Sequence, residues 1–549
     1  MLNRMDKEIA GMKPGAQSDG TAATTPQRMP LAQALALAEQ HRGMGRLPEA
    51  RSLCTSILAA QPNEAGAFHL LGLIAHQSGQ LDEAIAHLRH AVSLTPEVPL
   101  FHANLAEIYR LAGRVDDAVR EGRRAVELKP DYLEALSNLG VASYDQNDYE
   151  EAARCYRRAI DCNPKFATAH GNLGNALRAL ARFDEAIASY RIALALDRNF
   201  AGCWSNLGLT LAQLGRHDEA LDAYRTAVKA DPLLANGHVG VALQTLLRGN
   251  LADGWFEYQW RWRSSELSPP RIAAPAWQGD APAGRHILLV AEQGLGDTIQ
   301  MCRYAAVLRD AGAKVSLMVQ RPLVRLLSAS LPRAAVVEDQ PRHPACDVYC
   351  PLLTVPLLLG TTAETIPAAI PYLRAPAELA TAWQIELGDR GRLRVGVVWA
   401  GSPKHVNDHN RSVPLATLAP LLAIDGITWV SLQTGPRASE VAGVPEPPFD
   451  PSARLGDFLD TAALVSQLDL VISVDTAVAH LAGAMGVPVW VLLPVGNDWR
   501  WQLNREDTRW YPTMRLFRQQ AYGEWQPVVA RVREALSGLA NAGPDERRE

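Results

Sequence analysis

Apolar and polar residues alternate at helical spacing over residues 31–265, and the whole pattern returns at a fixed step. Matching stretches begin at residues 82, 116, 150, 184 and 218, so the step is 34 residues. A small residue recurs in each period, at Gly72, Ala106, Gly140, Gly174 and Gly208. Small side chains let two helices approach closely, and the proline that ends most periods stops a helix. Each period therefore predicts one helical hairpin.

A step of 34 residues is the period of the tetratricopeptide repeat. We predict six full repeats, at 31–64, 65–98, 99–132, 133–166, 167–200 and 201–234, and a divergent seventh at about 235–265. Such repeats stack into an α-solenoid, a TPR superhelix, whose groove binds an extended peptide or protein. We therefore expect a protein or peptide partner in this groove.

One polar column on the first helix of the repeats bears on that partner. It consists of Asn104, Asn138, Asn172 and Asn206. Evenly spaced amides are suited to hydrogen bonding with the backbone of a bound peptide. They are equally suited to tying each hairpin to its neighbouring repeat. Leu70 and Gly240 occupy the same column, so a peptide-binding ladder would have only these four members.

The seventh unit ends in an aromatic segment in which Trp255, Tyr258 and Trp262 recur at helical spacing. This spacing predicts a core-facing stripe that seals the last repeat and docks it on the next domain. We expect the domains to run as a disordered leader at 1–28, the solenoid at 29–265, a linker at 266–284, an N-terminal lobe at 285–390, and a C-terminal lobe with a final helix and short tail at 391–549.

From residue 285 the pattern changes to short apolar runs separated by helical segments. The predicted strands are 286–290, 314–319, 334–338, 394–401, 427–432, 469–474 and 488–493, with a proline-rich region at 341–376 between the two series. Alternating strands and helices indicate parallel sheets. We therefore predict an α/β domain with two Rossmann-like lobes, whose ligands bind at the carboxyl ends of the strands.

The first of these strand ends carries a Gly294-Leu295-Gly296-Asp297 turn. Gly294 and Gly296 permit a tight turn and a close backbone approach to a ligand. Asp297 begins the following helix. Its carboxylate is either a first-turn cap, for which Asp is well suited, or a catalytic group facing the cleft.

Two strand ends of the second lobe carry groups suited to phosphate. Ser402, Lys404 and Arg411 follow the strand at 394–401, either as a phosphate clamp or as solvated loop residues. Asp475 and Thr476 follow the strand at 469–474 and open a helix whose N-terminus suits a diphosphate. His480 lies about one turn into that helix.

These motifs resemble those of the heptosyltransferases (glycosyltransferase family 9), most specifically in the DTAVAHLAGAMGVPVWVL stretch. The resemblance covers roughly 285–540. It implies a GT-B fold and an inverting, metal-independent enzyme that uses a nucleotide-diphosphate sugar, typically ADP-heptose. It assigns the base to Asp297, phosphate binding to Lys404, and nucleotide-diphosphate contacts to Asp475, Thr476 and His480. Because the loop at 401–412 is long, Arg411 is the alternative to Lys404.

The two-part layout and the asparagine column also resemble O-linked N-acetylglucosamine transferases, which feed protein substrates to a GT-B domain. We accordingly predict a glycosyltransferase whose repeats recruit a protein acceptor. Two alternatives stay open: a non-catalytic repeat scaffold with a nucleotide-sugar-binding domain, and a transferase acting on lipopolysaccharide or lipid-linked glycans. Trp499, Arg500 and Trp501 either face the donor or acceptor, or pack.

Composition and charge bear on the kinds of partner and location that we expect for this protein. A net charge of −5 and a pI of about 6.3 give no sign of a nucleic-acid partner. No apolar run reaches the ~18 residues of a membrane span, and residues 1–28 lack the apolar core of a secretory signal. The seven cysteines form no zinc-binding array. We expect a cytoplasmic protein without a metal or a cofactor other than its sugar-nucleotide substrate.

Overall fold

The computed structural model describes residues 29–264, 267–340, 343–388, 392–403, 405 and 407–541. The chain divides into two compact units, Met1–Cys203 and Trp204–Glu549. The division falls inside helix α11 (Ala201–Gln213), so the last repeats belong to the same unit as the α/β region. The leader predicted at 1–28 lies outside the described residues.

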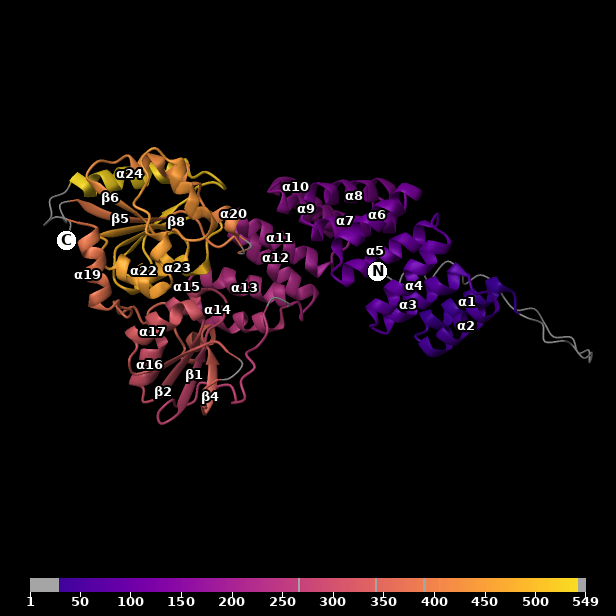
Figure 1. Ribbon diagram of the computed structural model, residues 1–549, viewed down its shortest axis with the longest axis horizontal. Helices are drawn as coiled ribbons and strands as arrows, with labels where there is room; N and C mark the ends of the chain where they lie inside the picture. Colours follow the sequence, from indigo (N-terminus) through magenta and orange to yellow (C-terminus); the bar gives the residue numbers. More distant parts are fainter. Residues whose placement is uncertain are drawn as a thin grey trace, which may run out of the picture. The chain divides into compact units, whose positions relative to one another are not determined.

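The first unit consists of antiparallel helical hairpins, which form a tetratricopeptide solenoid (Figure 1). Its helices are α1 (Leu31–Gly43), α2 (Leu47–Ala60), α3 (Ala65–Gln77), α4 (Leu81–Leu94), α5 (Pro99–Leu111), α6 (Val115–Leu128), α7 (Leu133–Asp145), α8 (Tyr149–Cys162), α9 (Ala167–Ala179) and α10 (Phe183–Leu196). The second unit begins with α11, α12 (His217–Ala230), α13 (Ala235–Leu247), α14 (Leu251–Glu257) and the 3₁₀ segment η2 (Tyr258–Arg263).

In four of the five periods the small residue is a glycine that faces a large side chain sixteen positions later; the exception is Ala106, where that position is Gly122. A Cβ atom added at Gly140 would lie 2.6 Å from the ring of Tyr156, and one at Gly174 would lie 2.5 Å from the ring of Tyr190. Such distances are too short for carbon atoms, so glycine is required where the ring fills the hairpin. The recurring glycines predicted from the sequence thus pack against the side chain of a tyrosine or a leucine.

The turn inside each hairpin follows the same step of 34 residues. A left-handed residue stands at each turn, namely Gly45, Gly79, Gly113, Asn147, Ala181, Gly215 and Gly249. Glycine adopts this conformation without a steric penalty, whereas an alanine does so at a cost. Ala181, with φ of 57°, is therefore a strained member of the column.

The α/β region contains two fully parallel sheets. The first has the order β3-β2-β1-β4, and its strands are β1 (His286–Val290), β2 (Lys314–Val319), β3 (Ala335–Glu338) and β4 (Val348–Pro351). The second has the order β6-β5-β7-β8-β9, and its strands are β5 (Leu393–Val398), β6 (Ile427–Ser431), β7 (Leu470–Val474), β8 (Val489–Leu493) and β9 (Met514–Arg518). The predicted parallel α/β architecture is confirmed.

The structure contains two strands that the sequence pattern does not predict. β4 lies inside the proline-rich region, and Pro351 itself occupies its last position, opposite Val290. A proline lacks the donor N–H, but β4 is the edge strand of this sheet and is bridged on its outer side only at Tyr349, so this loss is tolerated. β9 was hidden because Arg515 and Arg518 interrupt its apolar residues, although it pairs with β8 along its whole length.

The remaining helices connect the strands of the two sheets. They are α15 (Leu295–Met301), α16 (Tyr304–Asp310), η3 (Arg321–Leu323), α17 (Val324–Ser330), η4 (Leu352–Thr354), α18 (Val355–Leu358), α19 (Ala377–Glu386), α20 (Asp408–Arg411), α21 (Leu415–Leu422), η5 (Pro436–Gly443), η6 (Ser452–Arg454), α22 (Phe458–Val465), α23 (Ala477–Ala484), η7 (Trp499–Trp501) and α24 (Gln526–Asn541). Figure 1 shows α24 on one face of the second sheet and α22 and α23 on the other.

The hydrophobic core of the second unit is continuous from the last repeat into both sheets. Leu246 and Trp255 of the seventh repeat belong to the same cluster of buried residues as Leu289 of β1 and Leu481 of α23. The ring of Trp255 meets that of Trp499 edge-on at 4.9 Å. This shared core explains why the last repeats group with the α/β region.

The aromatic stripe predicted for the seventh unit is confirmed in two of its three positions. Trp255 and Tyr258 are buried, whereas Trp262 is only half-buried. The buried position near it belongs to Arg261, whose guanidinium lies 4.4 Å from the centre of the Trp262 ring. A helical stripe fails here because the segment turns into the 3₁₀ form at Tyr258.

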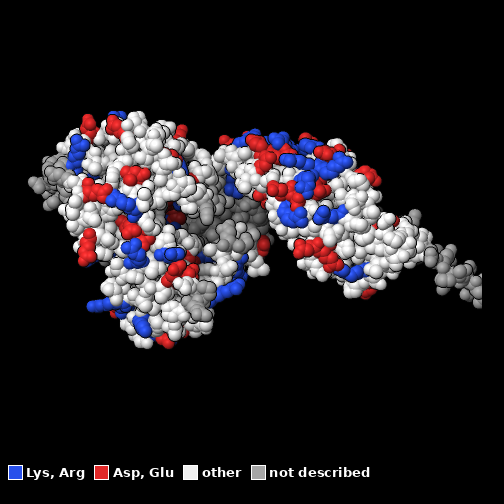
Figure 2. Space-filling model, viewed as in Figure 1, with Lys and Arg blue, Asp and Glu red and all other residues white. Residues whose placement is uncertain are grey.

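Charges of both signs are interspersed over the drawn face of the repeats, with no patch of a single sign (Figure 2). Among the described residues, no helix is long and apolar enough to cross a membrane. Within the same residues, no group of three or more His, Cys, Asp or Glu side chains is placed to hold a metal ion.

Candidate functional site

The turn after β1 presents Asp297 in the first turn of α15. Its carboxylate accepts a hydrogen bond of 2.8 Å from the N–H of Gly294, so the predicted cap is present. The same carboxylate forms an ion pair with Arg500. Burial raises the pKa of Asp297 above its ordinary value, against the opposing effect of Arg500. Capping and ion pairing thus occupy a carboxylate that is already harder to ionise than usual.

Arg500 is the residue at this site whose role the sequence left open. It lies on η7 with its side chain only 8% exposed, and its guanidinium donates hydrogen bonds to Gln300 at 2.6 Å and Asp498 at 2.8 Å. The cation also lies 4.3 Å from the centre of the Trp499 ring. The Arg500 guanidinium is thus held in a fixed place between two carboxylates.

His480 approaches Asp297 because α15 packs directly on α23. A Cβ atom added at Gly296 would lie 2.9 Å from Cδ2 of His480, so this glycine of the turn is required by the helix contact. The imidazole is buried, lies parallel to the Trp501 ring at 5.3 Å, and its Nδ1 is 2.9 Å from the hydroxyl of Tyr511. Burial, with Arg500 and Arg303 nearby, holds the pKa of His480 well below its ordinary value. The ring is therefore neutral at pH 7.

Asp475 and Thr476 lie at the start of α23, beside the loop that carries Arg411. The Arg411 guanidinium donates to the backbone carbonyl of Asp475 at 3.2 Å and pairs with Asp408 at 3.3 Å. Burial and the neighbouring Asp498 raise the pKa of Asp475 to about 6. The Thr476 hydroxyl lies 3.0 Å from that of Ser473, and the N-terminus of α23 has no side-chain cap.

The loop after β5 carries the residues predicted to bind phosphate, and the structure describes only some of them. Lys404 lies outside the described residues, and Ser402 is exposed. Gly401 permits the close approach of Arg411, because an added Cβ atom would lie 2.4 Å from its Nη2 atom. Among the described residues of this loop, Arg411 is therefore a cation that lies at the N-terminus of α23.

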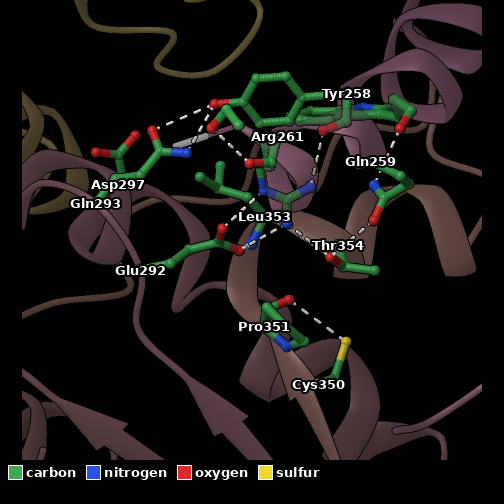
Figure 3. A network of polar contacts seen from close by, with 12 residues as sticks. Tyr258, Gln259, Arg261, Glu292, Gln293, Asp297, Cys350, Pro351, Leu353 and Thr354 are labelled. Carbon is green, nitrogen blue, oxygen red and sulfur yellow. Dashed lines mark hydrogen bonds and ion pairs between the residues drawn. The ribbon is translucent and has the colours of Figure 1, made fainter. Parts of the chain in front are cut away.

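A polar network ties the seventh repeat to the loop that carries Asp297 (Figure 3). Arg261 forms two hydrogen bonds with Glu292, at 2.8 and 3.0 Å, and Glu292 also accepts the N–H of Leu353. One step along, Tyr258 and the Gln293 amide hydrogen-bond each other, and Gln293 has a left-handed φ of 60°. The sequence offered no signal for this network, because its members are 31 to 95 residues apart.

Members of the asparagine column contact the preceding repeat. Nδ2 of Asn104 lies 2.7 Å from Nε2 of His69, and the Asn138 amide donates to the carbonyl of Ala103 at 3.4 Å. Asn172 instead lines a cavity of about 160 Å³ together with Tyr144. The tie between repeats, one of the two alternatives, is thus present at Asn104 and Asn138, and peptide binding by the column stays a prediction. At Asn206, the backbone carbonyl accepts a hydrogen bond from Thr210.

Comparison with known proteins identifies the repeats. Family models for the tetratricopeptide repeat match residues 72–111, 99–165, 137–201 and 172–235. Protein FlbA of Caulobacter vibrioides is 27% identical over 325 residues, which are 54% of this chain and 54% of FlbA. The chain thus matches about half the length of this curated relative.

Three solved structures are each similar to part of this chain. MamA is 24% identical, with 30% of this chain and 95% of MamA covered and a TM-score of 0.28. A tetratricopeptide repeat protein from Parabacteroides merdae is 15% identical, with 44% and 94% covered and a TM-score of 0.38. YrrB, a TPR protein with an unusual peptide-binding site, is 17% identical, with 34% and 95% covered and a TM-score of 0.30.

Proposed function

We propose that this protein is an inverting glycosyltransferase of GT-B type that moves a sugar from a nucleotide diphosphate to an acceptor hydroxyl. The observation that carries the proposal is one buried cluster around Arg500. Asp297 enters it on the side of the first sheet, while Asp475, directly after β7, and His480, on α23, enter it on the side of the second sheet. Groups from two parallel sheets thus meet where such sheets bind their ligands.

The chemistry follows from the charges of these residues. The acceptor hydroxyl gives its proton to the Asp297 carboxylate as its oxygen attacks the anomeric carbon. The bond between that carbon and the diphosphate oxygen breaks, and the diphosphate leaves with the electron pair. Arg411 and the uncapped N–H groups of α23 stabilise the charge that develops on it. Lys404 is the further cation that the heptosyltransferase resemblance assigns to this step.

Arg500 makes the basicity of Asp297 depend on the sugar donor. The charge of Arg500 is shared between Asp297 and Asp498, and this pairing lowers the basicity of Asp297. A diphosphate that attracts Arg500 would weaken this pairing and make Asp297 a stronger base. No metal or cofactor enters this proposal, and the repeats recruit a protein acceptor.

The test is a thermal-shift screen with nucleotide-diphosphate sugars, followed by transfer and donor-hydrolysis assays with the ligand found. Binding of the donor raises the apparent melting temperature. Asp297→Asn should keep this shift and lower turnover by about 10²–10⁴-fold, the usual contribution of a general base. Asp310→Asn, at an exposed carboxylate on α16, is the control and should leave both unchanged. Full turnover in Asp297→Asn would refute the assignment of the base.

A non-catalytic repeat scaffold is the second candidate, and one contact favours it. The Asp297 carboxylate is already held by Arg500 and by the Gly294 N–H, as a purely structural carboxylate would be. A scaffold would show neither transfer nor hydrolysis with any donor that shifts the melting temperature. Loss of stability in Asp297→Asn, with no change in donor binding, would support it.

A further inference from the structure

A cavity of about 610 Å³ lies between the last repeats and the segment that follows η7. One wall comes from the ends of α12 and α13, with Asp218 and Arg248, and another from residues 502–509, with Arg505 and Arg509. Ala363 and Glu364 complete the lining, so three arginines stand against two carboxylates. Its volume falls within the ~300–1,000 Å³ of ordinary ligand sites. None of the residues discussed for the proposed active site lines it.

Backbone carbonyls hold two of the three arginines of this cavity, Arg248 and Arg509, and the carboxylate partners of all three are exposed. The Arg248 side chain is 25% exposed and also donates to the carbonyl of Gln244, but its partner Asp218 is 99% exposed. Arg505 is 26% exposed and its partner Asp507 is 69% exposed. Ion pairs with exposed carboxylates contribute little and exchange readily. The guanidiniums of Arg248 and Arg505 therefore remain available to an incoming carboxylate.

Arg509 completes this set in the same manner. Its side chain is 39% exposed, and it donates to the carbonyl of Ala363 at 3.2 Å while its partner Glu364 is 73% exposed. A fourth arginine adds to the positive charge behind the cavity wall. Arg518 donates to the carbonyls of Arg505 and Trp501 and to the Asn497 amide oxygen, all of which are neutral acceptors. Burial and Arg505 lower the pKa of Arg518 to about 10, still leaving it charged at pH 7.

The backbone of the same wall is held in an unusual conformation. Gln502 and Asn504 have left-handed φ values of 50° and 55°, and both line the cavity. Such residues cost free energy and concentrate at ligand-binding sites. Their side-chain amides offer both donors and acceptors, which suits the backbone of an extended polypeptide.

We propose that this cavity, which we call the arginine cavity, binds an acidic polypeptide segment. Carboxylates of the ligand pair with Arg248, Arg505 and Arg509, and the amides of Gln502 and Asn504 hold its backbone. A peptide is favoured over a small anion because the cavity is larger than one phosphate needs. Its repeat wall also belongs to a class of protein that binds extended chains.

The position of the arginine cavity gives it a role that rests on the proposed function. Gln502 is two residues from Arg500, so their Cα atoms are at most ~7 Å apart. Arg500 in turn contacts Asp297. A polypeptide that extends from the cavity along this segment therefore approaches the proposed base, and on this proposal the protein selects acceptor hydroxyls that lie several residues from acidic side chains.

The test is a fluorescence-anisotropy titration of the full chain with a labelled peptide of alternating Asp, Ser and Gly. A matched peptide carries Asn at every Asp position. We expect the acidic peptide to bind at least tenfold more tightly, with an affinity that falls as salt is raised from ~50 to ~300 mM. Arg505→Gln and Arg509→Gln should each weaken binding about tenfold, the scale of one charge-assisted hydrogen bond. The control Arg309→Gln, at an exposed pair on α16, should have no effect.

Hydrogen exchange on the unmodified protein checks the site without a substitution, since a bound peptide should slow exchange at residues 502–509. Equal binding of the Asn peptide, or unchanged affinity in both arginine variants, would overturn the proposal. Displacement of the probe by inorganic phosphate as effectively as by unlabelled peptide would overturn it too. None of these measurements needs a sugar donor, so they can fail while donor binding persists, and they can succeed if no donor is found.

Discussion

Replacing Arg261 by methionine isolates the buried ion pair that joins the seventh repeat to the α/β region. The side chains of Arg261 and Glu292 are 2% and 5% exposed, and two hydrogen bonds join them. Methionine keeps the apolar stem and removes the charge. Breaking a buried pair from one side costs about 3–5 kcal/mol, because the remaining charge is left without a partner. We expect the free energy of unfolding of the second unit to fall by this amount at pH 8.

The pH dependence of this stability loss provides a second, independent test. Burial already raises the pKa of Glu292 although Arg261 opposes this effect. Without Arg261 the pKa of Glu292 in the folded state rises further above its value in the unfolded chain. A raised carboxyl pKa contributes stability at low pH that is lost as pH rises through the folded-state value. The defect of Arg261→Met should therefore shrink as the pH is lowered from 8 towards 5.

Tryptophan fluorescence during urea unfolding is the appropriate assay. All 13 tryptophans lie at residue 204 or beyond, so the signal reports the second unit alone. Arg285→Met, which breaks a pair between side chains 42% and 43% exposed, is the matched control and should cost less than about 1 kcal/mol. In Arg261→Met/Glu292→Gln most of the stability should return, since the amide oxygen still accepts the Leu353 N–H. A loss below 1 kcal/mol, or one that does not vary with pH, would refute this reasoning.

Three further predictions concern single positions. Ala181→Gly should stabilise the first unit by about 1 kcal/mol, because it removes an alanine from the left-handed conformation. Asn147→Gly should stabilise it less, because asparagine tolerates this conformation, and circular dichroism during urea unfolding measures both effects. Gly174→Ala should cost about 1–3 kcal/mol by overpacking a tyrosine ring, whereas Gly202→Ala, with no atom nearer than 3.9 Å, should not destabilise. Asp475→Asn should stabilise the second unit by up to about 3 kcal/mol at pH 8, since the pKa of Asp475 is raised from 3.8 to about 6. This gain in stability should vanish near pH 4, and a gain that persists at pH 4 would contradict the pKa shift.

The repeats were readable in the sequence because their determinants are local and recur. A glycine faces a large side chain in the hairpins of Gly72, Gly140, Gly174 and Gly208, and a residue with a left-handed φ stands at each turn. The first feature returns in four of the five periods, and the second returns at every 34-residue step. The column that ends with Gly249 could have been found in the same way, by searching for a second set of glycines at that step. Helix formation depends on near neighbours, so such patterns survive without knowledge of the fold.

The sequence by itself also determined the parallel α/β class and the strand ends that carry Asp297, Asp475 and His480. Only the tertiary structure decided what these residues meet. Arg500 reaches Asp297 across 203 positions of the chain, and Arg261 reaches Glu292 across 31. Contacts of this kind depend on how sheets and helices pack, which no periodicity records. Packing also determines β4, whose proline is tolerated because the strand lies at the edge of the sheet.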